Sequence, residues 1–472
     1  MHPIDLSPLS TGTSAQAAPA PRFYAMAWRW HFYAGLYVVP FLFVLALSGM
    51  VMVFFTGFQT RLGAPVHVTP QTQVLAVSAQ ALAVQARWPD AALKEYVAPR
   101  APDLTSWFVV GRGDATEAVA VNPYTAQILK TVDKDHTVFA WAERIHGSLL
   151  LGDVGDRLIE IAAGLAVVMV VTGLYLWWPR GAQRWSALLL PNLRARGRAW
   201  WKSLHASVGF WLSLGLLAFL LSGMSWTGVW GAQLVQPWNS FPASKWNDVP
   251  KSEASHASLN HGSEKAVPWA LEQTPLPASG SAAGTPGVPA GQPVDLDSVA
   301  ALATRLGFTG QHHIQLPSGD DGVYTISADS MSGDMDDPTG DRTVHVDRYS
   351  GRVLAEAVFA EYPLLGRVMA VAVALHQGDM GWLNAGVNLL FCAGVVFLCV
   401  SGVVMWWKRR PAGSARLVAP GVPTSPLRWK TGAFVMLGVA LCFPLAGVAL
   451  VGMLLLDALL ISRIPALKAA LS

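Results

Sequence analysis

Cysteine and charged residues are both scarce in this sequence, which limits the disulfides and the separate polar domains that the chain can form. Only 13% of the 472 residues are charged, and the three cysteines, Cys392, Cys399 and Cys442, all lie inside apolar runs. The segments between those runs can therefore form no disulfide, even in an oxidising compartment. No G-x-G-x-x-G fingerprint occurs, and no polar segment is large enough to form a separate flavin or nicotinamide domain.

Long apolar runs, by contrast, are abundant in the sequence. Hydrophobic residues make up 52% of the chain, and several runs reach about 20 residues, enough to cross a hydrocarbon core of ~30 Å. The pattern predicts an α-helical multi-pass membrane protein with about five transmembrane helices. Their apolar cores are expected at 32–55, 158–178, 206–230, 384–407 and 432–456.

Acidic residues are absent from two connections between the runs, 179–204 and 408–430, and each connection carries six Lys or Arg residues. The positive-inside rule places both in the cytoplasm, with the N-terminus, and puts the long segments 58–155 and 231–383 on the outer side of the membrane. We expect no cleaved signal peptide, because the first run is long and lacks an A-x-A-like site. The net charge of +3 mostly reflects the inner connections and indicates no nucleic-acid surface.

An internal duplication is the most informative feature of the chain. "HFYAGLYVVPFLFVLALSGM" begins at His31 and "HASVGFWLSLGLLAFLLSGM" at His205, with Ser-Gly-Met starting seventeen residues after each histidine. "HGSLLLGDVGDRL" at His146 leads to "VTGLYLWWPR", and "HQGDMGWLN" at His376 leads to "VSGVVMWWKR". Between these helices, "VNPYTAQIL" and "VDRYSGRVL" are each typical of a strand, a turn and a strand, and each follows a helical stretch.

The duplication predicts two copies of a helix, an outer α+β domain and a second helix, followed by a fifth helix without a counterpart. Both copies have the same orientation, so their pseudo-twofold axis should run along the membrane normal. The expected parts are a disordered cytoplasmic tail at 1–21, transmembrane helices at 22–57, 146–178, 205–230, 376–407 and 431–456, periplasmic domains at 58–145 and 231–375 with a flexible insert at 251–293, cytoplasmic loops at 179–204 and 408–430, and a periplasmic tail at 457–472.

Four of the twelve histidines occupy equivalent places at the ends of the duplicated helices. His31 and His205 are expected on the inner side of the membrane, and His146 and His376 on the outer side. The pseudo-twofold axis brings each pair to one depth, whereas the two histidines of one copy are separated by the membrane thickness of roughly 30 Å. Ligand pairs must therefore form between the copies.

Paired histidines at one depth suit a haem. Two axial imidazoles give a six-coordinate iron suited to electron transfer rather than to oxygen binding, and the absence of C-x-x-C-H makes both haems b-type. Gly35 and Gly209, one turn after His31 and His205, would let a porphyrin approach the backbone. Two alternatives stay open: another metal, or histidines that belong only to interfacial aromatic belts. Candidate partners for the haem propionates are Arg29, Arg144 and Lys202.

Several of these stretches resemble the PepSY-associated transmembrane family over about residues 22–410: the two "H-x-x-x-G … S-G-M" helices, "RIHGSLLLG", "ALHQGD", "WWPR", "WWKR", "NPYTAQIL" and "DRYSGRVL". The resemblance implies an inner-membrane siderophore reductase of the FoxB type, which carries haem and passes electrons outward to ferric iron held in a siderophore. Some relatives add a cytoplasmic flavoprotein domain, which has no counterpart in this sequence. The electron donor would then be a quinol or a separate reductase.

Two other functions remain as alternatives. A non-enzymatic scaffold, whose PepSY-like domains bind a peptidase or another periplasmic partner, predicts a colourless protein. A siderophore transporter would need discontinuous helices around a midplane site, whereas these spans look continuous. Glu160, just inside the second span, is either functional or reaches the membrane interface, and we expect the latter.

Weaker candidates for substrate contact lie in the second outer segment. His312, His313 and the acidic loop 329–341 would suit an iron chelate, but an exposed strand edge and a solvated loop explain them at least as well. His256 and His261 fall in the insert that is expected to be flexible, so both are expected to be solvated.

Overall fold

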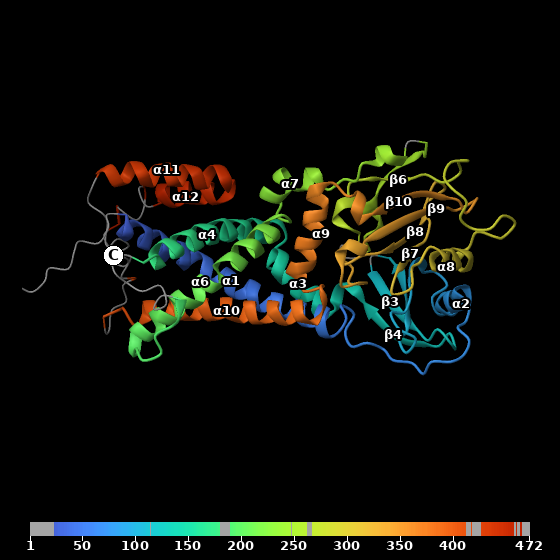
Figure 1. The fold of residues 1–472 in the computed structure, drawn as a ribbon, viewed down its shortest axis with the longest axis horizontal. Helices are drawn as coiled ribbons and strands as arrows, with labels where there is room; N and C mark the ends of the chain where they lie inside the picture. Colours follow the sequence, from blue (N-terminus) through green and yellow to red (C-terminus); the bar gives the residue numbers. More distant parts are fainter. Residues whose placement is uncertain are drawn as a thin grey trace, which may run out of the picture.

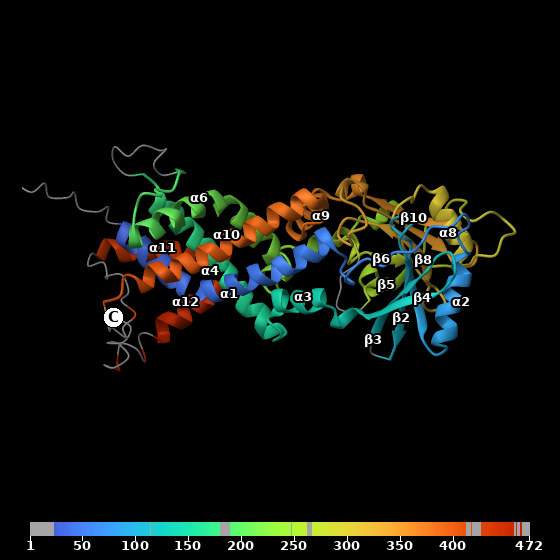
Figure 2. The ribbon, with the colours of Figure 1, turned by 90° about the horizontal axis from the view of Figure 1, so that it is seen from below.

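The computed structural model describes residues 23–113, 115–179, 189–246, 248–261, 267–411, 417, 426–456, 459 and 463–464, with the backbone alone at 426–432 and 454. The expected tail at 1–21 and most of that at 457–472 lie outside these residues. Two parts lie end to end, a bundle of long helices and a unit built around a β-sheet (Figure 1, Figure 2). The end of the bundle next to the sheet is called the sheet end below, and the opposite end the far end.

Four long helices form the bundle: α1 (Tyr24–Phe58), α4 (Asp153–Trp177), α6 (Gly197–Met224) and α10 (Gly381–Trp407). Each is long and apolar enough to cross a membrane, as expected of a multi-pass membrane protein. α1 and α6, the first helices of the two copies, each pack against both α4 and α10. Small residues in the shared core, such as Ala46, Ala163 and Ala166, let the helices approach closely.

The second and fourth spans differ from the expectation, because neither 146–178 nor 376–407 is a single helix. α3 (Val138–Ser148) ends at Leu149, whose φ is 52°, before α4 begins. α9 (Leu364–Gln377) ends at Gly378, whose φ is 85°, before α10 begins. Both breaks use the left-handed conformation in which helices commonly end. His146 and His376 therefore each lie in the last turn of a short helix at the sheet end.

The segment expected as a fifth spanning helix, 431–456, is a helical hairpin. α11 (Pro426–Cys442) and α12 (Pro444–Leu456) meet at Phe443 and lie side by side along the far half of the bundle (Figure 1, red). Pro444 lacks an amide donor and disfavours helix in the residue before it, which ends α11. A Cβ at Gly447 would lie 2.5 Å from the Cβ of Ala440, so glycine is needed where the helices meet. Within the described residues, four helices rather than five are long enough to cross a membrane.

Both copies contribute to one antiparallel eight-stranded sheet of order β10-β9-β8-β7-β1-β2-β3-β4. β1 of the first copy pairs with β7 of the second, with Glu95 opposite Gln315 and Val97 opposite His313. The helices α2 (Val77–Arg87) and α8 (Leu296–Arg305) pack into one core with the strands of both copies. The two domains expected at 58–145 and 231–375 are thus joined in one unit, in which the edges of β1 and β7 pair with each other instead of being exposed. The strands are β1 (Ala92–Val97), β2 (Ser106–Arg112), β3 (Ala115–Val121), β4 (Ile128–Asp133), β7 (His313–Gln315), β8 (Val323–Ala328), β9 (Arg342–Asp347) and β10 (Val353–Val358).

The described residues of the insert, 251–261 and 267–293, pack against the sheet unit, contrary to the expectation that it is flexible. β5 (Lys251–Ser255) pairs with β6 (Pro275–Pro277), and Trp269 and Leu271 are buried in a core that also holds Trp246. The Gly, Ser and Pro content favoured flexibility, yet burial of the few large apolar side chains is enough to fold the segment back. The remaining short helices are α7 (Trp230–Leu234), η1 (Lys134–His136), η2 (Gln236–Trp238), η3 (Ala243–Trp246), η4 (His256–Leu259), η5 (Trp269–Leu271), η6 (Pro338–Gly340) and η7 (Phe359–Glu361).

The histidines of this insert are not solvated bystanders. His256 is fully buried, and its Nε2 lies 2.9 Å from the Nε2 of His345 on β9. Burial lowers the pKa of His256 to about 4, so the pair is held together in the neutral form. His261 is half-buried and its Nε2 lies 2.8 Å from Oε1 of Gln315.

Candidate functional site

The four duplicated histidines meet as two pairs, each made of one residue from each copy. The rings of His31 on α1 and His205 on α6 have centroids 6.5 Å apart and planes at 89°. The rings of His146 on α3 and His376 on α9 have centroids 6.4 Å apart and planes at 85°. We call the first the far pair and the second the sheet-side pair. The pairing between copies is the one that the duplication predicts.

The two pairs lie at opposite ends of the bundle. Ser48, which contacts His146, is seventeen residues after His31 on α1, a distance of about 25 Å along a helix that rises 1.5 Å per residue. The two histidines of one copy therefore cannot share a metal, as the sequence indicates.

The separation within each pair fits one metal ion between the rings. Two imidazoles that bind opposite sides of one metal through bonds of about 2 Å have ring centroids roughly 6 Å apart. Among the described residues, no group of three or more His, Cys, Asp or Glu side chains is arranged to hold a metal ion. Two facing imidazoles are the ligand set of a six-coordinate haem iron, so the residues of each pair would fit that group.

Each of the four rings is anchored through Nδ1 by a hydroxyl on a neighbouring helix. In the far pair, His31 Nδ1 lies 3.2 Å from Thr172 Oγ1, and His205 Nδ1 lies 2.7 Å from Ser401 Oγ. In the sheet-side pair, the corresponding distances are 3.1 Å from His146 to Ser48 and 2.7 Å from His376 to Ser222. Within the described residues, all hydrogen bonds of these rings are made by Nδ1.

The hydroxyls fix the tautomer of the rings. Each one donates its proton to a carbonyl in the preceding turn of its own helix, for example Ser222 to Ala218 at 2.9 Å and Thr172 to Val168 at 2.8 Å. A hydroxyl has one proton, so its oxygen accepts from the histidine. His31 Nδ1 also lies 2.9 Å from the carbonyl oxygen of Met169, which can only accept. In the neutral form Nδ1 therefore carries the proton, and Nε2 keeps the lone pair that a metal binds.

A glycine follows each anchoring hydroxyl and lies against the same ring. A Cβ at Gly173 would lie 3.1 Å from Cε1 of His31, and one at Gly49 would lie 3.3 Å from Cε1 of His146. Sequence reasoning assigned these Ser-Gly and Thr-Gly pairs no role. The signal was present, because "SGM" occurs in both first helices and "VTG" and "VSG" in both second helices. The equivalent distances are 3.7 Å for Gly223 to His376 and 3.9 Å for Gly402 to His205.

The predicted propionate partners differ in how well they are placed. Arg144, two residues before His146, lies over the ring of Trp141 and donates to the carbonyl of Asp135, while its buried Nε has no hydrogen-bond partner among the described residues. That orphaned donor suits an acidic group near the sheet-side pair. Arg29 contacts Tyr33 instead, with its guanidinium 5.1 Å from the ring, and Lys202 is exposed.

The glycines Gly35 and Gly209 lie in equivalent packing positions. A Cβ at Gly35 would be in van der Waals contact with Met169 Sδ at 3.6 Å, and one at Gly209 with Leu398 Cδ2 at 3.7 Å. Met169 and Leu398 also sit in the turns that hold the anchoring hydroxyls of α4 and α10. The two glycines thus face the helices that position the far pair.

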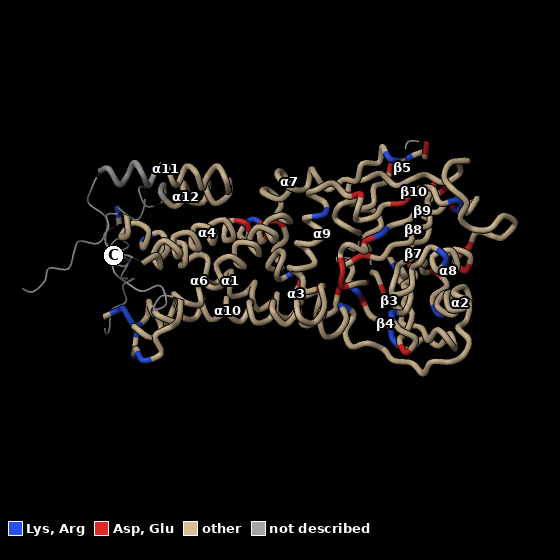
Figure 3. Tube along the Cα trace, viewed as in Figure 1, with Lys and Arg blue, Asp and Glu red and all other residues tan. Residues whose placement is uncertain are grey.

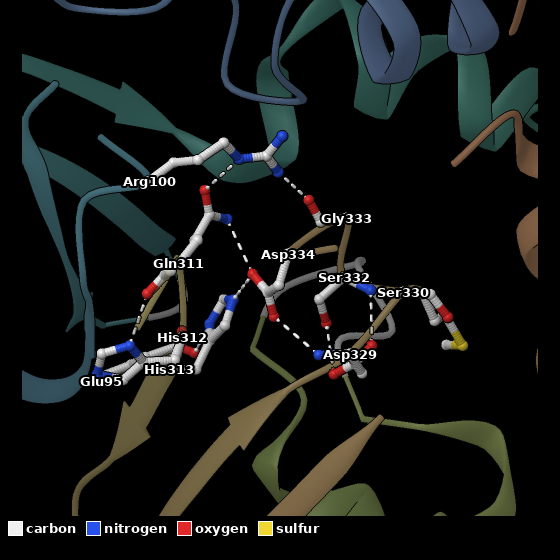
Figure 4. A network of polar contacts seen from close by, with 12 residues as sticks. Glu95, Arg100, Gln311, His312, His313, Asp329, Ser330, Ser332, Gly333 and Asp334 are labelled. Atoms are coloured by element: carbon white, nitrogen blue, oxygen red, sulfur yellow. Dashed lines mark hydrogen bonds and ion pairs between the residues drawn. The ribbon is translucent and has the colours of Figure 1, made fainter. Parts of the chain in front are cut away.

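The weaker candidates in the second outer segment are more buried than a solvated loop or a strand edge would be, although the loop 329–341 also has exposed residues such as Asp336 and Asp337. β7 lies in the middle of the sheet, and His313 is held between Glu95 of the first copy at 2.6 Å and Asp334 at 3.0 Å (Figure 4). Burial opposes charge on His313, but these two carboxylates outweigh it and raise its pKa well above 6.5. His312 is also buried, with Nδ1 2.8 Å from the carbonyl oxygen of Gly310. Within the loop 329–341, the buried carboxylates are those of Asp329, Asp334 and Asp341.

Glu160 lies near the sheet end of α4 and is buried. Its side chain is 2% exposed, and its carboxylate accepts hydrogen bonds from the amides of Val229 at 3.0 Å and Trp230 at 3.1 Å. It therefore fastens the turn after α6 to the start of α4.

A duplicated bundle with paired histidines at both ends and a sheet shared by the two copies defines a class of multi-pass membrane protein built from two equivalent halves. The family described as "PepSY-associated TM region" matches residues 28–409, which is most of the chain. The chain belongs to this family. A search of the curated proteins finds no match.

Proposed function

We propose that this protein carries two b-type haems, one at each histidine pair, and transfers electrons across the bacterial inner membrane to ferric siderophore iron. The observation that carries the proposal is the duplicated geometry of the pairs. Four imidazoles from two copies meet two by two, each held by a hydroxyl that leaves Nε2 available. Histidines that belonged only to interfacial aromatic belts would not require this repeated pairing.

The residues of the chain hold the ligands in place. Hydroxyls on neighbouring helices orient the rings before any ligand binds, which reduces the ordering cost of coordination. When bound, haem supplies a one-electron iron couple, and two axial imidazoles favour electron transfer over oxygen binding. Pairing between copies makes each site depend on both halves of the protein.

The proposed orientation has the far end in the cytoplasm and the sheet unit in the periplasm. Lys and Arg residues gather at the far end of the bundle, as the positive-inside rule requires of a cytoplasmic face (Figure 3). Electrons would enter there from a quinol or a separate reductase. A separate protein is favoured, because basic loops steer the approach of an acidic partner.

Reduction of the metal accounts for its release. Each ferric ion takes up one electron and becomes Fe(II), whose lower charge attracts the hard oxygen ligands of a siderophore less strongly. The iron then becomes available for uptake on the periplasmic side.

Two measurements on the purified protein test the proposal. Absorbance spectra, oxidised and after dithionite, should show two six-coordinate b-type haems per chain. The reduced protein should be reoxidised by a ferric siderophore, with Fe(II) appearing in a chelator trap, and His146→Ala or His376→Ala should abolish this reaction. A colourless protein would favour the scaffold instead, and haems that ferric chelates cannot reoxidise would refute the reductase assignment.

A further inference from the structure

The half-buried guanidinium of Arg409 at the far end has two buried donor atoms without an acceptor among the described residues. Arg409, just after α10, is 5.0 Å from the ring centroid of Trp28 and 5.4 Å from that of Phe32. Its Nε and Nη2 atoms are buried and have no hydrogen-bond partner among the described residues. Leaving such donors unsatisfied is costly, and more so for a charged group.

A second cation lies near Arg409. Burial, and after it the positive charge of Arg198 on α6, lower the pKa of Arg409. Arg198 itself donates from Nε to the carbonyl of Met405 at 3.4 Å. Two guanidinium groups that repel each other, Arg409 half-buried and Arg198 exposed, favour an anion between or beside them.

The described part of the chain provides no acid for this purpose. Asp and Glu are absent from 6–89, 161–247 and 380–456, which contain all the described segments that reach the far end. The acidic side chains nearest in sequence to these segments at that end are Asp5 and Asp457, and both lie outside the described residues.

The site lies close to the far pair. Trp28 and Phe32, which cover Arg409, are three residues before and one residue after His31 on α1. Arg198 is seven residues before His205, two turns of α6 and about 10 Å nearer the end of the helix. An anion bound here would therefore lie next to the far pair, on the side toward the far end of the bundle.

We propose that Arg409, together with Arg198, binds an anionic oxygen group beside the far pair. Guanidinium groups match the planar, bidentate acceptors of carboxylates and phosphates. The anion has two sources with this chemistry: a propionate carboxylate of the haem, which rests on the function proposed above, or the phosphate of a phospholipid headgroup.

The carboxylate source is tested by haem binding to the full-length apoprotein in a His146→Ala background, so that only the far pair loads. Haem should bind roughly tenfold to a hundredfold more tightly than its dimethyl ester, the loss expected for one charge-assisted hydrogen-bonded pair. Arg409→Gln should remove this preference. Lys408→Gln, which removes the same charge from the exposed neighbouring residue, should keep it.

The phosphate source is tested on the same variants by native mass spectrometry. Arg409→Gln should then lose one retained phospholipid per chain, while Lys408→Gln keeps it and the preference for haem over its ester is the same in all variants. This readout does not depend on haem, so a colourless protein would refute the proposed function while leaving the anion site testable.

Two results would overturn the inference. One is that Arg409→Gln behaves like Lys408→Gln in both the haem and the lipid measurements. The other is that the double variant Asp5→Asn, Asp457→Asn reproduces the losses of Arg409→Gln, because the chain's own carboxylates would then be the partners.

Discussion

Ser401 on α10 holds His205 on α6 through a 2.7 Å hydrogen bond between Oγ and the ring Nδ1. The serine donates its own proton to the carbonyl of Leu398 at 3.1 Å, so its oxygen accepts from the ring. A hydroxyl on one helix thus fixes both the tautomer and the direction of the histidine on another. Partners of this kind orient the ligands of metal sites and tune their strength.

Removing that hydroxyl should weaken the far site alone. We expect Ser401→Ala to lower haem affinity at the far pair about 10–100-fold, the usual cost of losing an outer partner of a metal ligand. Haem titration of the apoprotein in the His146→Ala background measures it. Ser401→Thr keeps the hydroxyl and should retain the affinity. An unchanged affinity and an unchanged low-spin spectrum in Ser401→Ala would show that the hydrogen bond does not position a ligand.

Single histidine variants should group by pair rather than by copy. His31→Ala and His205→Ala should each remove the same haem, because loss of either ring leaves the iron with one protein ligand, and His146→Ala should match His376→Ala. Haem content per chain and separate redox titrations of the two centres measure this. If His31→Ala and His146→Ala affected one shared haem, the pairing in the structure would not be the functional one.

The histidine pairing could be predicted from the sequence, because equal spacing in two copies fixes the depth of each residue on its helix before the packing is known. The anchoring hydroxyls could not be assigned in the same way. Ser401 and His205 are separated by 196 residues, and sequence periodicity does not show which helix faces which. The repeated Ser-Gly and Thr-Gly pairs were visible, but only the packing of helices connects them to the rings.

The errors in predicting the fold from the sequence have physical causes of the same kind. The run 431–456 is apolar throughout, and hydropathy gave no weight to Pro444, around which it turns back. The pairing of β1 with β7 depends on two exposed edges meeting, which no local pattern encodes. In the insert, two buried residues, Trp269 and Leu271, outweigh the Gly, Ser and Pro residues around them.

The glycines beside the rings allow a steric test with a matched control in the other copy. A Cβ at Gly173 would lie 3.1 Å from Cε1 of His31, which is tighter than ordinary contact, whereas one at Gly402 would lie 3.9 Å from Cε1 of His205. Gly173→Ala should therefore displace His31 and lower haem retention at the far pair severalfold, and Gly402→Ala should have little effect. Equal effects of the two alanines would mean that the rings adjust freely and that the close approach is incidental.

The acidic loop between the sheet and the bundle should make stability depend on pH. Asp341 is 3% exposed and accepts a hydrogen bond from the amide of Ser330 at 2.8 Å. Burial, aided by the charges of Asp334 and Asp337 and opposed by the hydrogen bonds from Ser330, raises the pKa of Asp341 to about 7. In the unfolded chain the same carboxyl has a pKa of about 3.9.

A carboxyl whose pKa is raised on folding contributes stability that is fully present below pH ~4 and is lost as the pH rises through about 7. Asp341→Asn keeps the acceptor for Ser330 but cannot ionise, so the variant should gain more in Tm over the natural protein at pH 8 than at pH 4. Scanning fluorimetry of the detergent-solubilised protein at both pH values measures the difference. Asp90→Asn is the control, because it removes one carboxylate at an exposed position outside this loop and should give no such pH-dependent gain. A Tm change for Asp341→Asn that is equal at pH 4 and pH 8 would mean that Asp341 is not held neutral by its surroundings.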